Sequence, residues 1–197
     1  MKEIIETLEK RGFTVKTASG AAQAREMLLS ATEGAASVGI GGSVTIQQLD
    51  VVGAMQDRGQ AVHWHWLPGD KAGALRSAAT ADVYLASANA LTRDGKLLFI
   101  DGTGNRTAAI ISGPAKVILV IGKNKLVDNE EAGLARIRTV ACPQNARRLN
   151  LQTPCALTGK CADCRSPQRM CNAFLKLEHR PGAHPVEIIL VDEEMGY

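Results

Sequence analysis

Long apolar runs are absent from this sequence. No stretch approaches the ~18 to 20 consecutive apolar residues that a membrane-spanning helix requires. The first residues, MKEIIETLEKRGF, form a charged amphipathic pattern without the apolar core of a secretory signal. We therefore expect a soluble, cytoplasmic protein with no membrane partner.

Aromatic residues are scarce and charge of one sign is not in large excess. Aromatic residues make up 4% of the 197 residues, and 23 Lys and Arg face 20 Asp and Glu. No long basic run and no interleaving of basic and aromatic side chains appears, so nucleic acid is not the expected partner. A hydrophobic share of 45% is enough for the core of one ordinary domain, which we predict to span residues 1–197.

Short apolar runs alternate with helical patterns along most of the chain. This alternation predicts an α/β fold with an open, mostly parallel sheet. The run AKVILVIG is apolar throughout, as is typical of a strand covered on both faces. Strands are expected at residues 13–18, 36–40, 60–66, 82–87, 96–101 and 115–122, with a helix before Gly12, helices at 19–34, 45–59, 68–80 and 105–112, and a short helical turn at 88–92.

The pattern changes after Gly122. A helix is predicted over residues 128–138, with Asp128 as N-cap, followed by a break at Cys142-Pro143 and a further helical piece at 144–151. Two strands are predicted near the C-terminus, FLKLEHR and VEIILVD. They either extend the edge of the sheet or form an antiparallel ribbon beside the cysteines.

A glycine-rich loop, SVGIGGSVT, joins a predicted strand to a predicted helix. Free N–H groups at such a helix start favour a phosphate or a carboxylate. We predict that Gly41, Gly42, Ser43 and Thr45 bind an anion, although glycines at such a position also serve the turn alone. The dinucleotide fingerprint G-x-G-x-x-G is not met.

A second loop, DGTGNR, follows the strand predicted at residues 96–101. Ligands bind at the carboxyl ends of strands in open α/β sheets. Asp101 can act as a base, Asn105 can donate and accept hydrogen bonds, and Arg106 can clamp a carboxylate or phosphate. These three are the catalytic candidates, and Gly102 and Gly104 are candidates for substrate binding. The alternative is a tight turn in which Asp101 caps the backbone and Arg106 faces solvent.

The stretch HWHW alternates two residue types. Period-two alternation in a strand would place His63 and His65 on one face and Trp64 and Trp66 on the other. Two such histidines can bind a metal or transfer protons, but they are more often half-buried and hydrogen-bonded.

Four of the five cysteines lie in CALTGKCADCRSPQRMC. Cys161 and Cys164 form a short C-x2-C chelating unit, and Cys155 and Cys171 supply two more thiolates. Clustered cysteines in a reducing compartment are more often metal ligands or redox groups than disulfides. We expect residues 142–172, the cysteine segment, to bind a 4Fe–4S iron–sulfur cluster, with zinc or metal-free redox-active thiols as alternatives. Cys142 is either a spare thiol or a core residue.

The chain resembles the lactate-utilisation (LUD) domain family from about residue 36 onward. The resemblance rests on GIGGSVT, SANALTRDGKLLFIDGTGNR, SGPAKVILVIGKNKLV, RIRTVACPQNARRL and TPCALTGKCADCRSPQRMCN, in this order. It implies a Rossmann-like fold similar to the sugar-phosphate isomerase and CoA-transferase superfamily. It also implies a role in bacterial oxidation of L-lactate to pyruvate beside iron–sulfur partner proteins. The chain looks like a short member with its own cysteine segment.

Three functions are compatible with these features. The first is a subunit or accessory factor in the oxidation of L-lactate or a similar organic acid, with Arg106 and the loop amides holding the carboxylate. One cluster moves one electron at a time, so a redox partner must complete this two-electron step. The second is a non-redox enzyme on a phosphorylated or acyl substrate, with Asp101 as base and structural zinc. The third is a metabolite-sensing or redox-sensing module. Turnover by the chain itself and assembly as a homo-oligomer stay open.

Overall fold

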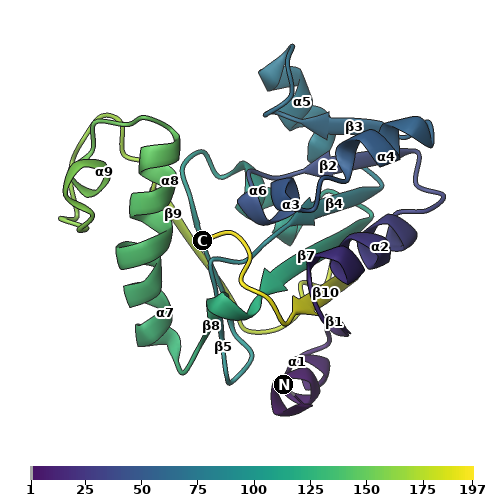
Figure 1. Ribbon diagram of the computed structural model, residues 1–197, viewed down its shortest axis with the longest axis horizontal. Helices are drawn as coiled ribbons and strands as arrows, with labels where there is room; N and C mark the ends of the chain where they lie inside the picture. The colour runs from purple at the N-terminus through teal and green to yellow at the C-terminus, as the bar shows by residue number, and fades with distance from the viewer. Residues whose placement is uncertain (1) are drawn as a thin grey trace.

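A six-stranded parallel sheet forms the centre of the computed structural model, which describes residues 2–197 (Figure 1). Every neighbouring pair of strands in this main sheet runs parallel. The predicted α/β fold with an open, mostly parallel sheet is therefore confirmed. In spatial order the strands are β1 (Thr14–Ala18), β10 (Val186–Val191), β7 (Lys116–Gly122), β4 (Val83–Ala86), β2 (Ser37–Ile40) and β3 (Ala61–Trp64).

Helices cover both faces of the main sheet. The strand β7 shows why: Val117 and Leu119 join one hydrophobic cluster, while Ile118 and Val120 join the other. Successive side chains of a strand point to opposite faces, so a continuous apolar run needs cover on both sides. The covering helices are α1 (Lys2–Lys10), α2 (Ala21–Ala31), α3 (Val44–Gln48), α4 (Val52–Asp57), α5 (Lys71–Ala78) and α6 (Asn105–Ile111).

A second sheet of four strands lies beside the first. Its spatial order is β8 (Leu126–Val127), β5 (Ala90–Thr92), β6 (Leu97–Asp101) and β9 (Ala173–Leu177). The helical turn predicted at 88–92 is wrong, because Ala90 and Leu91 pair antiparallel with β6 across a tight turn at Gly95, whose φ is +81°. The strand predicted at 96–101 exists, but it belongs to this second sheet.

The two C-terminal strands go to different sheets. The strand β10 lies inside the main sheet, between β1 and β7, and all six of its residues are buried. Its apolar run is thus explained by cover on both faces, as for β7. The strand β9 pairs antiparallel with β6. For β10 both predictions were wrong: it lies neither at the edge of the sheet nor in an antiparallel ribbon beside the cysteines.

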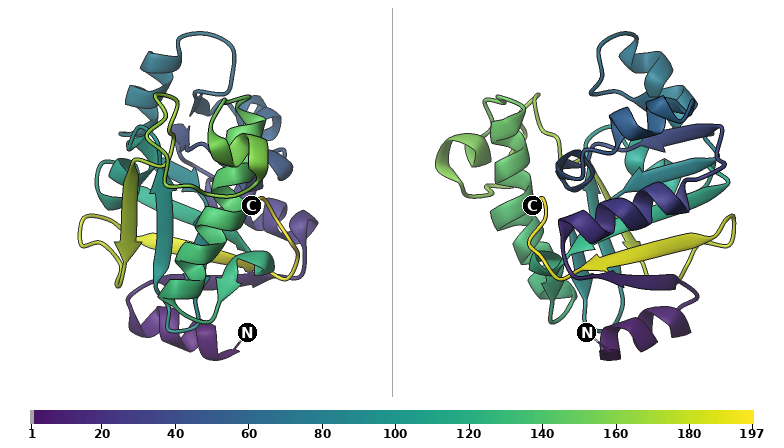
Figure 2. Two further views of the ribbon diagram at one scale, coloured as in Figure 1. Left: turned by 90° about the vertical axis from the view of Figure 1, so that its left-hand side faces the viewer. Right: turned by 45° about the vertical axis from the view of Figure 1, so that its right-hand side comes forward.

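A helical arm stands beside the main sheet (Figures 1 and 2). It consists of α7 (Glu130–Arg136), a π-helical turn (Ile137–Ala141), α8 (Cys142–Arg148) and the short α9 (Pro154–Thr158). The predicted break at Cys142-Pro143 is absent, because the π-helical turn carries the helix past the proline, which lacks an N–H. The N-cap is Asn129, which accepts a 2.9 Å hydrogen bond from the N–H of Ala132, whereas Asp128 pairs with Arg93.

One helix predicted in the N-terminal half differs in the structure. The helix predicted at 45–59 is divided into α3 and α4, and Asp50 between them has a φ of +48°.

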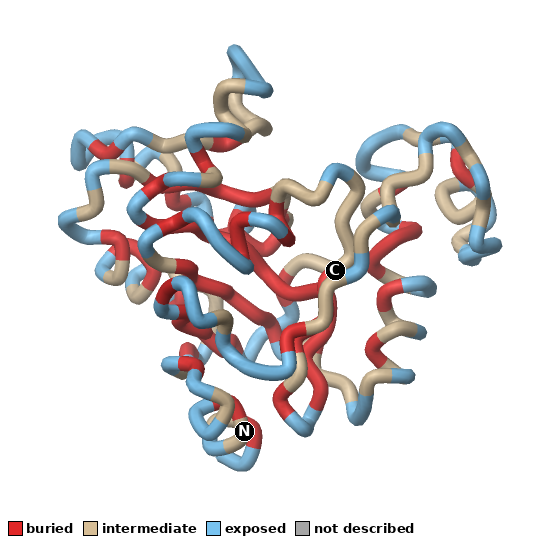
Figure 3. Tube along the Cα trace, turned by 180° about the vertical axis from the view of Figure 1, so that it is seen from behind, coloured by how far each residue is buried: buried red, intermediate tan, exposed pale blue. Residues whose placement is uncertain are grey.

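Burial is highest in the strands of the main sheet and lowest in the outer part of the arm (Figure 3). Within residues 2–197, no helix combines the length and the apolar character needed to cross a membrane.

Candidate functional site

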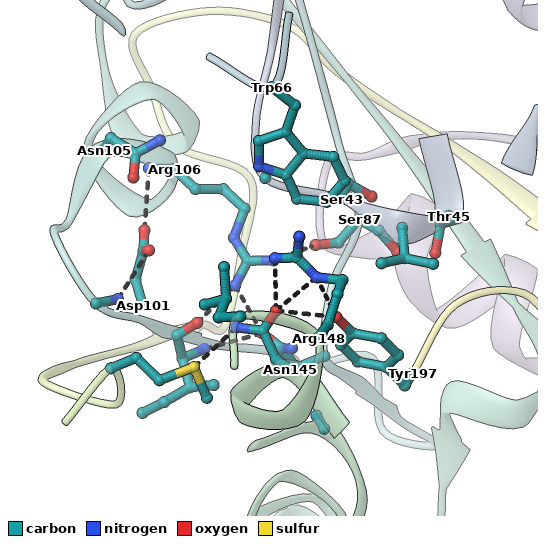
Figure 4. A pocket seen from close by; sticks show the side chains of 18 of the residues that line it. Ser43, Thr45, Trp66, Ser87, Asp101, Asn105, Arg106, Asn145, Arg148 and Tyr197 are labelled. Carbon is teal, nitrogen blue, oxygen red and sulfur yellow. Dashed lines mark hydrogen bonds between the residues drawn. The ribbon is translucent and has the colours of Figure 1, made fainter. Parts of the chain in front are cut away.

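A cavity of about 580 Å³ lies between the main sheet and the helical arm (Figure 4). Its floor is formed after the carboxyl ends of four neighbouring strands, β3, β2, β4 and β7. Open α/β sheets bind ligands at this edge. Of the predicted residues, seven line this central cavity: Gly42, Ser43, Thr45, Asp101, Gly102, Asn105 and Arg106. Gly41 and Gly104 are not among the lining residues.

The glycine-rich loop uses its side chains mainly within the protein. The hydroxyl of Ser43 caps α3 by accepting a 3.2 Å hydrogen bond from the N–H of Ile46. Gly41 is needed for close packing, since a Cβ there would lie 2.8 Å from the Tyr84 hydroxyl and 3.3 Å from Cγ of Arg106. The helix α3 has only five residues, so its dipole contributes little to anion binding.

Asp101 caps the start of α6. Its carboxylate accepts hydrogen bonds from the N–H groups of Gly102, Arg106 and Thr107, each at 3.0 Å. This is the arrangement that the tight-turn interpretation predicts for Asp101. The turn needs Gly104 for its positive φ of +81°, and Asn105 accepts a 2.7 Å hydrogen bond from the hydroxyl of Thr103.

Arg106 is buried rather than solvated, with 8% of its surface exposed. Its guanidinium donates to the side-chain oxygen of Asn89 at 2.8 Å, to the carbonyl of Ile100 at 2.6 Å and to the carbonyl of Ser87 at 3.3 Å. Three of its five N–H donors are therefore used, and two remain for a ligand in the cavity that it lines. In the described part of the chain no carboxylate pairs with this guanidinium.

Lys125, which the sequence analysis missed, lies at the floor of the cavity. It is 2% exposed, and its Nζ donates to the hydroxyls of Thr45 and Ser87, both at 2.8 Å. Burial lowers the pKa of Lys125 well below its usual value, and the charges of Arg136 and Arg106 lower it further. No sequence signal marks it, because lysines that follow strands are mostly exposed.

The rim of the cavity joins the arm to the main sheet. The guanidinium of Arg148, on α8, lies 4.2 Å from the ring centroid of Trp66. Its Nε also donates to the hydroxyl of Tyr197 at 2.8 Å, and Tyr197 donates to Asn145 at 2.9 Å (Figure 4). These contacts bring together α8, the loop after β3 and the tail, which are far apart in the sequence.

The two histidines of HWHW do not line the same site. The strand β3 ends at Trp64, so the predicted alternation stops there. His65 lines the cavity and His63 does not. Burial lowers the pKa of His65, and the charge of Arg148 lowers it further. The rings of Trp64 and Trp66 stack with centroids 4.9 Å apart.

The five cysteines are free thiols, one of them buried and four at least partly exposed. Cys142 is buried in a small cluster against which Cys171 packs, so it is a core residue. Burial raises the pKa of Cys142 to about 12, and the nearby thiols of Cys171, Cys155 and Cys161 add to the rise. Burial raises the pKa of Cys171, and the thiols of Cys161, Cys164 and Cys155 add to this rise, which the charge of Arg169 opposes.

The thiol sulfurs do not converge on one metal-ion site. Within residues 2–197, no three His, Cys, Asp or Glu side chains lie close enough together to hold one metal ion. The donor set is nevertheless one of sulfur atoms, which suits an iron–sulfur cluster or zinc rather than a hard cation. A cluster binds each thiolate through a different iron, so it needs the sulfurs near one another but not converging on one ion. The thiols present fit such a group in type and number.

The cysteine segment forms part of the cavity wall. Met170 lines the cavity and accepts a hydrogen bond at its sulfur from Asn145 at 2.8 Å. The N–H of Asn172 donates to the carbonyl of Asp101 at 2.9 Å, and its side chain donates to the carbonyl of Gly102 at 3.1 Å. Cys171 lies between these two anchors. The sequence analysis assigned the cysteines and the DGTGNR loop to separate sites. In the structure, Asn172 of the cysteine segment contacts the DGTGNR loop directly.

Together, the fold and the site define a Rossmann-like α/β protein with a ligand cavity at the carboxyl edge of its sheet and a thiol-rich segment beside it. The sequence profile of the LUD domain matches residues 1–191, so the chain belongs to the LUD domain family, as the resemblance predicted. This family is associated with lactate utilisation.

A solved structure supports the same fold. The crystal structure of a DUF162 family protein from Deinococcus radiodurans is similar to this chain, with a TM-score of 0.57 and 17% sequence identity. The similarity covers 97% of this chain and 98% of that chain. No curated protein sequence matches the chain.

Proposed function

We propose that the protein is a component of the oxidation of L-lactate or a similar small organic acid, with a thiolate-bound metal centre. The observation that carries the proposal is that a cationic cavity and the cysteine segment share a wall at Met170 and the Asp101–Gly102 turn. A small carboxylate in this cavity would lie next to the group that the cysteines hold.

The charges around the cavity favour a small anion. Arg106, Arg148 and Lys71 line it, whereas Asp101 is the single acidic side chain among the described lining residues. Asp101 accepts hydrogen bonds from three backbone N–H groups, and it forms no ion pair among residues 2–197. Arg106 retains two free N–H donors, one on Nε and one on Nη1, and each can donate a single hydrogen bond to a ligand oxygen. A volume of about 580 Å³ is in the range of small-molecule sites.

The cysteine segment is the proposed site of a 4Fe–4S cluster. Cys155, Cys161, Cys164 and Cys171 would hold it, and such a cluster supplies one-electron transfer when bound. Arg169 stabilises the surrounding backbone by donating to the carbonyls of Cys164 and Cys171 at 2.6 and 3.2 Å. Its positive charge also offsets the negative charge of the thiolates.

The oxidation of a hydroxy acid releases two electrons, so this chain needs a partner that accepts them. We propose iron–sulfur partner proteins for this role, in the cytoplasm, where free thiols persist. In this scheme Arg106 and Arg148 bind and orient the carboxylate, while Trp66 and Tyr197 limit access of water from the rim.

Metal analysis of anaerobically purified protein tests the metal part of the proposal. We expect a brown protein with iron and acid-labile sulfide in equal amounts. A colourless protein with stoichiometric zinc would contradict the redox role and support a non-redox enzyme. A metal-free protein with reversibly oxidised thiols would support a sensing module.

Thermal unfolding with added ligand tests the cavity separately. L-lactate and pyruvate should raise the melting temperature, whereas the same concentration of sodium chloride should not. An equal effect of all three salts would contradict a carboxylate site.

A further inference from the structure

The amine of Lys125 is in an unusual position for a lysine. It is buried at the floor of the central cavity, and its hydrogen-bond partners are two neutral hydroxyls, Thr45 and Ser87. No ion pair with Lys125 occurs among residues 2–197. Buried charges in proteins are normally paired, because an unpaired ion loses its hydration without compensation.

The surroundings make the neutral amine the stable form. The guanidiniums of Arg106 and Arg136 lie near Lys125 and repel a third positive charge. Burial acts in the same direction. A lysine that is desolvated and next to other cations is a nucleophile at neutral pH, as in enzymes that form Schiff bases.

Lys125 and Arg106 both donate hydrogen bonds to Ser87. Ser87 accepts a hydrogen bond from Nζ of Lys125 at its hydroxyl and one from Arg106 at its carbonyl. Both side chains line the central cavity, so an acid whose carboxylate binds Arg106 lies in the same cavity as the amine. In a 2-oxo acid, the carbon next to the carboxylate is a carbonyl carbon, which an amine can attack.

We propose that Lys125 forms a covalent imine with the carbonyl carbon of a 2-oxo acid bound in the central cavity. The proposal rests on the function proposed above in one respect, the binding of a small carboxylate by Arg106. It goes further because a hydroxy acid such as lactate has no carbonyl carbon to attack, so only the oxidised acid is held covalently.

The step balances without a further reactant. The lone pair of Nζ attacks the carbonyl carbon and forms a C–N bond, and the carbonyl oxygen takes up one proton from the nitrogen to become a hydroxyl. The hydroxyl then leaves with the second proton of the nitrogen as water, and a C=N bond remains. The hydroxyls of Ser87 and Thr45, both 2.8 Å from Nζ, are placed to relay these protons.

Reductive trapping on the full-length protein tests the proposal. The protein is incubated with pyruvate and sodium cyanoborohydride, and the modified lysine is located by peptide mass spectrometry. We expect one reduced pyruvyl group per chain, on Lys125. An excess of L-lactate should slow the labelling by competing for the same carboxylate site.

Two variants give matched controls. Lys125→Met should abolish the label, and it should fold because Thr45 and Ser87 keep other acceptors, the carbonyls of Met195 and Ala88. Lys71→Met removes the other lysine of the cavity wall, which is exposed, and should leave the label in place. The labelled position in the unmodified chain decides the question even if Lys125→Met does not fold.

The outcomes separate this inference from the function on which it rests. No label, or a label spread over surface lysines, overturns the imine. If pyruvate still raises the melting temperature in that case, the carboxylate site stands and only the imine fails. If pyruvate neither labels nor stabilises the protein, both are overturned.

Discussion

The floor of the central cavity and the outer cysteine segment differ in how firmly the fold holds them. The floor follows four adjacent strands, and its two central basic side chains, Arg106 and Lys125, are buried and hydrogen-bonded to neighbouring oxygens. By contrast, none of residues 154–172 is buried, and α9 has five residues. The floor is preorganised by packing, whereas the outer segment has few buried contacts, and the metal centre proposed above would supply its order.

The largest expected effect is on the cysteine segment. Cys161→Ser and Cys164→Ser should each lose the bound metal, because a hydroxyl is a poor replacement for a thiolate. Proteolysis within residues 155–171 should then become faster, while the main sheet stays folded. Metal content and limited proteolysis measure the two effects. Ala162→Ser, which adds the same hydroxyl to the exposed residue between them, should change neither. Full metal content in the cysteine variants would contradict the assignment.

The next effect is on the floor of the cavity. Arg106→Ala should weaken the binding of a small carboxylate by roughly 1.5 to 3 kcal/mol, the value of a charged hydrogen bond. It should also lower the free energy of unfolding by about 1 to 3 kcal/mol, since oxygens of Asn89 and Ile100 lose their donor. Titration calorimetry and denaturant unfolding measure these values. Arg93→Ala removes an exposed ion pair with Asp128 and should change stability by less than about 1 kcal/mol. Equal effects of the two variants would contradict a special role of Arg106.

An effect on stability alone is expected where the glycine loop packs against the floor. Gly41→Ala should destabilise the protein by about 1 to 3 kcal/mol, because its Cβ would lie 2.8 Å from the Tyr84 hydroxyl. Gly53→Ala, in the exposed part of α4, has no atom within 4 Å of the new Cβ. It should instead stabilise the protein by about 0.5 to 1 kcal/mol. Denaturant unfolding compares the pair, and a Gly41→Ala protein as stable as Gly53→Ala would show that the loop is not tightly packed.

The smallest effect concerns acid stability of the main sheet. Burial by itself raises the pKa of Glu187, but hydrogen bonds from Lys16 and Lys116 outweigh it and leave the pKa below its usual value. The two ion pairs measure 2.8 and 2.9 Å. A lowered carboxyl pKa contributes stability above the unfolded pKa of about 4.3, and this stability disappears as the pH falls through the folded pKa.

Unfolding measured from pH 7 downward tests this effect. Glu187→Gln should flatten the loss of stability below about pH 4.3, because the substituted amide does not titrate there. Glu33→Gln, at an exposed position, should leave the curve unchanged. Parallel curves for the unmodified protein and Glu187→Gln would contradict the role of the two lysines.

The sequence predicted the main sheet because its central strands, β7, β4 and β2, are local runs that are largely apolar. It could not predict the second sheet, whose strands β5 and β8 have three and two residues and are defined only by their pairing. It also could not predict the position of β10 in the sheet. An apolar run indicates burial on both faces, but it does not indicate which strands lie beside it.

The same distinction applies to the site. The two loops that begin at Gly41 and Asp101 were recognisable because turn residues follow strands. Lys125 and Ser87 were not, since their importance comes from a contact between segments 38 residues apart. The shared wall between Met170 and the Asp101 turn is likewise a tertiary contact without a local sequence signal.

The measurement that tests the central claim most directly is an electron paramagnetic resonance spectrum of the anaerobic, chemically reduced protein, with and without saturating pyruvate. The account predicts an iron–sulfur signal whose shape changes when pyruvate occupies the cavity next to the cysteine segment. A protein without such a signal, or a signal that saturating pyruvate leaves unchanged, would contradict it.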